Sequence, residues 1–103
     1  MDKYKHYIRL ALTVVGEISE KHTCIKRDNR GTIPFTFEKN KYRLEISNED
    51  AKLIAYGNML SDYKLGFCDN DVFLTWLRSI LMEISINGLG PVVRRSHRIR
   101  GGV

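Results

Sequence analysis

The sequence has little cysteine: only Cys24 and Cys68 occur among its 103 residues. Two cysteines are too few for the disulfide framework that stabilises small secreted domains, so we expect two reduced thiols in an intracellular protein. No run of 18 apolar residues occurs, which argues against a membrane-spanning helix and a membrane partner. The apolar stretch after Arg9 is short and lacks a small-residue cleavage pattern, so we do not read it as a signal peptide.

The sequence also lacks a strong catalytic or metal motif. His22, Cys24, Cys68 and His97 could supply four zinc ligands, but no CxxC pair occurs. The run 69–71 has the first acidic positions of a calcium loop without its glycine or closing glutamate, so we interpret it as a helix cap. No nucleophile can be paired with a base from the serine, cysteine and histidine residues. We therefore expect a non-enzymatic protein that needs neither a cofactor nor a metal.

Composition and length predict one small globular domain. Hydrophobic residues make up 43% of the chain and charged residues 28%, which is ordinary for a folded protein. We expect a compact domain over residues 1–90, followed by a basic flexible tail over residues 91–103 that has no apolar periodicity.

The apolar pattern predicts an α+β fold with an N-terminal helix, a three-stranded antiparallel meander and two C-terminal helices. Residues 3–21 fit the spacing of an amphipathic helix better than the alternation of a strand. Residues 23–27 indicate a weak strand, and residues 32–37 and 42–46 alternate on either side of a short polar turn, which is typical of a meander. A second helix is expected to begin at Ser47 or Asn48 and end at Gly66, and a third to cover residues 71–87.

The third predicted helix is more apolar than one face against a small core requires. Phe73 and Trp76 lie in the middle of its apolar stripe and are expected to be buried. Met82 and Ile86 lie outside that stripe. Because exposed apolar side chains often mark contacts, the two residues predict an interface and a homo-oligomer.

The net charge of +5 is unevenly distributed along the chain. Residues 21–43 carry seven cations and two acids, residues 44–88 carry three cations and seven acids, and residues 89–103 carry four arginines and no acid. A basic segment attracts phosphate, whereas an acidic segment argues against a surface that binds polyanions everywhere.

This charge pattern predicts binding to the backbone of RNA or DNA through a basic hairpin and an arginine tail. The candidate contacts are Lys26, Arg27, Arg30, Lys39, Lys41, Arg43, Arg94, Arg95, Arg98 and Arg100. The alternative is a protein-partner module, an inhibitor or assembly subunit that uses an apolar helix face and an acidic helical surface. A third hypothesis is a self-assembling subunit whose arginine tail contacts the acidic face of the next copy.

Overall fold

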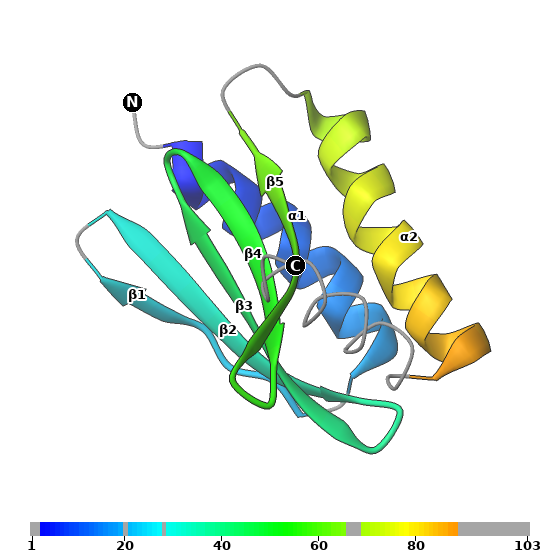
Figure 1. The fold of residues 1–103 in the computed structure, drawn as a ribbon. Helices are drawn as coiled ribbons and strands as arrows, with labels where there is room; N and C mark the ends of the chain where they lie inside the picture. The colour runs from blue at the N-terminus through cyan, green and yellow to red at the C-terminus, as the bar shows by residue number, and fades with distance from the viewer. Residues whose placement is uncertain (1–2, 20, 28, 66–68, 89–103) are drawn as a thin grey trace, which may run out of the picture.

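A computed structural model describes residues 3–19, 21–27, 29–65 and 69–88. Five strands form one antiparallel sheet in sequence order, and two helices cover the same face of it (Figure 1). The elements are α1 (Lys3–Ile18), β1 (Ile25–Arg27), β2 (Arg30–Phe37), β3 (Asn40–Ser47), β4 (Asp50–Ala55), β5 (Asn58–Lys64) and α2 (Asn70–Asn87).

The α+β class is as expected, but the prediction of three strands and two C-terminal helices is wrong. Residues 48–65 form the β4–β5 hairpin instead of a helix, so α2 is the single helix after the sheet. In β4, the buried residues Ala51, Leu53 and Ala55 alternate with partly exposed ones, which is the pattern of a half-buried strand. The spacing of Leu53, Tyr56 and Leu60 also fits a helix, which is why local periodicity predicted one here.

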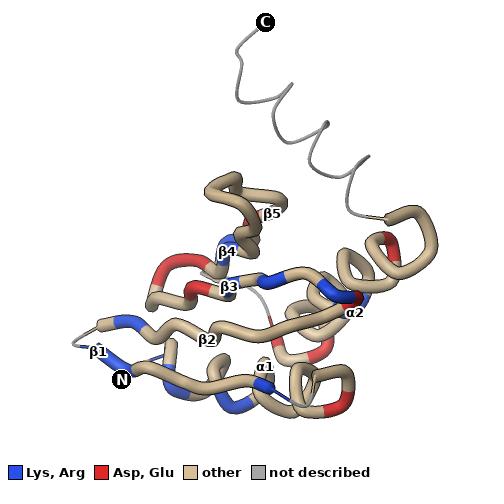
Figure 2. The backbone as a smooth tube through the Cα atoms, turned by 90° about the horizontal axis from the view of Figure 1, so that it is seen from below, with Lys and Arg blue, Asp and Glu red and all other residues tan. Residues whose placement is uncertain are grey.

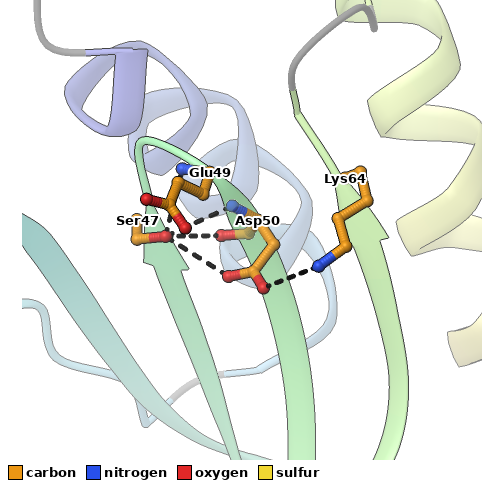
Figure 3. A network of polar contacts seen from close by, with 4 residues as sticks. All are labelled: Ser47, Glu49, Asp50 and Lys64. Carbon is orange, nitrogen blue, oxygen red and sulfur yellow. Dashed lines mark hydrogen bonds and ion pairs between the residues drawn. The ribbon is translucent and has the colours of Figure 1, made fainter.

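Ser47 explains why the local chemistry resembled a helix start. Its Oγ atom accepts hydrogen bonds from the backbone amides of Glu49 and Asp50, both at 3.2 Å (Figure 3). An N-cap serine makes the same kind of bond to the first amides of a helix. Here the bonds close the turn between β3 and β4, and Asp50 then pairs with Lys64 on β5 at 3.6 Å.

The core lies between the sheet and the two helices. Ile33, Leu44 and Leu53 are fully buried and follow one another across β2, β3 and β4. Phe73 is fully buried in α2, as expected, whereas Trp76 is only partly buried. Its indole donates a hydrogen bond to Ser61 on β5 at 2.9 Å, so this side chain closes the edge of the core.

The two helices run in the same direction, with matching ends side by side. Near their N-terminal ends, the rings of Tyr7 and Phe73 meet edge to face at 4.9 Å. Farther along, the guanidinium of Arg78 contacts the carboxylate of Glu17 at 3.0 Å. The C-terminal end of α2 reaches the β2–β3 turn. We call this end of the molecule, which holds the β2–β3 and β4–β5 turns, the turn end.

The expected boundary at residue 90 and the tail over residues 91–103 lie outside the described residues. No helix in the described ranges is both long and apolar enough to cross a membrane.

Candidate nucleic-acid interface

Two tight hairpin turns stand side by side at the turn end. Glu38 and Lys39 have φ angles of 51° and 67° in the β2–β3 turn, and Tyr56 and Gly57 have 52° and 73° in the β4–β5 turn. Two-residue hairpins favour positive φ at both central positions, which glycine adopts without steric cost. Among the described residues, Glu38, Lys39 and Tyr56 are the only ones other than glycine with positive φ.

One hydrogen bond joins these two turns, and three others hold each turn in place. The Tyr56 hydroxyl donates to Oδ1 of Asn40, and Nδ2 of Asn40 donates to the Glu38 carbonyl at 3.0 Å. Nδ2 of Asn58 donates to the Tyr56 carbonyl at 3.3 Å. Ser85 at the end of α2 donates to the Glu38 carboxylate at 3.1 Å, which fixes the β2–β3 turn against the helix.

We call Lys39, Asn40, Lys41, Tyr56 and Asn58 the turn cluster. Tyr56 is 68% exposed, and the lysines on either side of Asn40 are exposed as well. The cluster therefore combines two ammonium groups, an accessible aromatic ring and two side-chain amides on one rigid support. Ammonium groups bind phosphate, and an exposed ring stacks on a base.

Tyr42 lies below the cluster and has a different role. It faces the helices, is 3% exposed and stacks on Phe35 at 5.4 Å. Burial raises the pKa of its phenol. Tyr42 is therefore a core residue, as the alternation of β3 indicated.

Arg43 lies two residues beyond Lys41 on the face of the sheet that no helix covers. Its Nε atom contacts the carboxylate of Glu45 at 2.8 Å. The positive charge of Arg43 is therefore partly compensated within the protein, whereas Lys39 and Lys41 form no ion pair within the described ranges.

The structure separates the basic residues that the sequence grouped in one hairpin. Lys26, Arg27 and Arg30 lie at the opposite end of β2, which is about 25 Å long at eight residues. Acidic residues of the β3–β4 turn lie at the same end of the sheet (Figure 2). A hollow of about 710 Å³ there is lined by Arg27, Asn29, Arg30, Ser47, Asn48 and Glu49.

The acidic residues make this second basic region less positive than the sequence indicated. Glu49 lines the same hollow as Arg27 and Arg30. The remaining predicted contacts, Arg94, Arg95, Arg98 and Arg100, lie outside the described residues.

Tyr56 is the site residue that the sequence analysis missed, because residues 48–65 were assigned to a helix. The available signal was the dipeptide Tyr56-Gly57 between two runs of strand-like residues. Asn-Gly and Asp-Gly are the stronger forms of that signal, and an aromatic residue at the first position conceals it.

Met82 and Ile86 lie on the outer surface of α2 and are 62% and 72% exposed. Next to Met82, an apolar groove of about 320 Å³ runs between α1, α2 and the end of β2. Its lining residues are Val14, Ile18, Phe37, Arg78, Leu81, Met82 and Ser85.

Within the described ranges, no three His, Cys, Asp or Glu side chains are close enough to hold a metal ion. Of the four zinc-ligand candidates, Cys24 is a free thiol, and the Nδ1 atom of His22 lies 3.2 Å from the Ser19 carbonyl oxygen. Cys68 and His97 lie outside the described residues.

Comparisons with protein-family models, curated proteins and solved structures give no match for this chain.

Proposed function

We propose that this protein is a non-enzymatic nucleic-acid-binding protein whose main contact surface is the turn cluster, and that it prefers single-stranded RNA or DNA. The observation that carries the proposal is the placement of Lys39 and Tyr56. Both side chains are exposed on left-handed residues of adjacent, hydrogen-bonded turns.

The two kinds of contact have separate physical origins. Lys39 and Lys41 neutralise phosphates and release counterions, which gives affinity without sequence preference. The ring of Tyr56 stacks on an unpaired base, and each such stack contributes about 1–3 kcal/mol. A duplex keeps its bases paired, so the stacking term favours a single strand.

The other basic residues are assigned a secondary role. Lys26, Arg27 and Arg30 stand a strand length from the turn cluster, so a long single strand could reach both ends of the sheet. The arginines at positions 94–100 add further positive charge along the chain. Deletion of residues 92–103 is expected to weaken binding and to leave the preference for single strands intact. An intracellular location, expected from the two thiols, suits this function.

Binding of fluorescein-labelled 20-nucleotide oligo(dT), oligo(U) and duplex DNA at low salt tests the proposal. Tyr56→Ala is expected to weaken binding to the single strands by about 5- to 150-fold, the equivalent of one lost stack. Tyr56→Phe keeps the ring and loses only the bond to Asn40, so its affinity is expected to stay close to the wild-type value. Equal affinities of Tyr56→Ala and wild type, or no binding to any of the three, contradict the proposal.

A protein-partner module is the second candidate, favoured by the exposed Met82 and Ile86 beside the apolar groove. Large exposed apolar side chains next to one another are typical of protein contacts. This candidate is favoured over the first if none of the three nucleic acids binds and a variant at Ile86 changes the mass of the assembly in solution.

A further inference from the structure

The outer face of α2 carries no charged side chain. It consists of five exposed residues at alternating spacings of three and four: Val72, Thr75, Ser79, Met82 and Ile86. The charged residues Asp71 and Arg78 stand on one flank of this face, and Glu83 stands on the other. Arg78 is on the flank next to α1, where it contacts Glu17. Glu83 is on the other flank, on the same side as Trp76, which contacts β5.

This spacing is that of the a and d positions of a heptad repeat. With Val72, Ser79 and Ile86 at a, the d positions are Thr75 and Met82, Arg78 is at g and Glu83 is at e. We propose that the outer face of α2 binds the same face of a second copy of this chain, with the two helices parallel. The pairing is isologous, so one two-fold axis relates the copies and the assembly closes as a dimer.

Charge complementarity sets the orientation. In a parallel pair, the g position of one helix lies beside the e position five residues later on the other helix. Arg78 and Glu83 are five residues apart, so each copy's Arg78 lies beside the second copy's Glu83, and the pair occurs twice. An antiparallel pair instead brings like flanks together and places the two Arg78 guanidinium groups near each other.

The parallel orientation has a consequence for the turn end. The C-terminal end of α2 contacts the β2–β3 turn through Ser85 and Glu38. Two parallel α2 helices therefore carry both turn clusters at the same end of the dimer, where one nucleic-acid strand can reach both. The association itself does not rest on nucleic-acid binding and is tested without nucleic acid.

Cysteine cross-linking tests the arrangement directly. In a background with Cys24→Ser and Cys68→Ser, Ile86→Cys places a thiol at an a position, where parallel copies face each other at disulfide distance. After oxidation with diamide, at least several-fold more covalent dimer is expected for Ile86→Cys than for the matched control Ile25→Cys. Ile25 is also an exposed isoleucine, 46% accessible, but lies on β1. Equal yields for the two variants overturn the proposal.

The same experiment distinguishes the two orientations. In an antiparallel pair the a positions of one helix face the d positions of the other, so a pair with Ser79 beside Met82 brings Thr75 of one copy to Ile86 of the other. A mixture of Thr75→Cys and Ile86→Cys then gives mainly the mixed dimer, and that result overturns the parallel arrangement.

A charge exchange provides an independent test by sedimentation across the micromolar range. Arg78→Glu and Glu83→Arg each place like charges across the interface, so each variant alone is expected to associate at least tenfold more weakly than wild type. An equimolar mixture restores both attractive pairs and is expected to return to within a few-fold of the wild-type dissociation constant. A mixture no tighter than the single variants, or a wild-type protein that stays monomeric throughout, overturns the proposal.

Discussion

The phenolic oxygen of Tyr56 donates a hydrogen bond to Oδ1 of Asn40 and thereby joins the β4–β5 turn to the β2–β3 turn. The two residues are 16 positions apart in the sequence. The meander brings them together because the β2–β3 and β4–β5 turns both lie at the turn end. Lys39 and Lys41 flank Asn40, so this bond fixes the distance between a stacking ring and two phosphate-binding charges. The proposed function uses both kinds of contact at this one end of the sheet.

The left-handed backbone of Lys39 predicts that one substitution there raises the stability of the protein and weakens its binding to single strands. Lys39→Gly removes the steric cost of a side chain at positive φ and is expected to raise the free energy of unfolding by up to about 1 kcal/mol. The same change removes a phosphate contact and is expected to weaken binding to single strands.

Lys41→Gly is the matched control for this prediction. Lys41 lies in β3, where glycine loses more conformational freedom on folding, so this variant is expected to be less stable by about 0.5–1 kcal/mol. Urea unfolding of both variants measures the difference. Stability changes of the same sign in the two variants contradict the account of the turn.

The buried phenol of Tyr42 predicts a loss of stability at alkaline pH. Burial raises its pKa above the ordinary value of 10.0. Because the folded-state pKa is the higher one, the neutral phenol contributes fully below pH 10.0 and this contribution is lost as the pH rises through the folded-state value.

Tyr42→Phe removes the ionisable group. In the wild-type protein, the Tyr42 hydroxyl has no hydrogen-bond partner among the described residues. Leaving a buried hydroxyl unpaired is costly, so we expect Tyr42→Phe to be as stable as wild type or more stable at neutral pH. Above pH 10.0, the variant is expected to lose less stability than wild type. Parallel alkaline curves for the two proteins would show that Tyr42 does not titrate differently on folding.

Gly31 predicts a steric coupling between the sheet and α1. A Cβ atom at this position would overlap the end of the Ile8 side chain, closer than real Cβ atoms approach other atoms. Ile8 is 1% exposed and has little room to move. Gly31→Ala is therefore expected to destabilise the protein by about 1–3 kcal/mol.

Ile8→Val removes the overlapping methyl group, so the double variant with Gly31→Ala is expected to recover part of that loss. Thermal unfolding of both single variants and the double variant gives the interaction energy. Additive effects of the two substitutions contradict the steric explanation.

Both helices, β2 and β3 were predictable because their buried residues follow one period without interruption, whereas β1, whose three residues are all exposed, was placed only by the polar turn that follows it. In α1, Tyr4, Ile8, Ala11 and Val15 are buried, as the helical spacing predicted. The β4–β5 hairpin was not predicted from the sequence, because β5 has one extra residue opposite the step from Leu53 to Ile54. This register shift interrupts the alternation of buried and exposed residues on β5.

The candidate site was predicted only in part for the same reason. Lys39 and Lys41 were expected at a turn, and the structure places Lys39 in the β2–β3 turn and Lys41 as the second residue of β3. Tyr56 entered the site only through the pairing of β3 with β4, which local periodicity does not show. Lys26 and Arg30 likewise lie a strand length away from Lys41. The sum of charge along the sequence had placed all three in one basic segment.

The salt dependence of binding to oligo(dT) tests the central claim most directly. For single strands, each phosphate contact contributes about 0.7 to the slope of log affinity against log salt. The double variant Lys39→Ala, Lys41→Ala is expected to have a slope smaller than wild type by about 1.4, which corresponds to two lost contacts. Arg9→Ala, on the exposed surface of α1, is the control and is expected to leave the slope unchanged. A wild-type slope in the double variant, or an equal reduction in Arg9→Ala, would contradict the assignment of the turn cluster as the nucleic-acid contact.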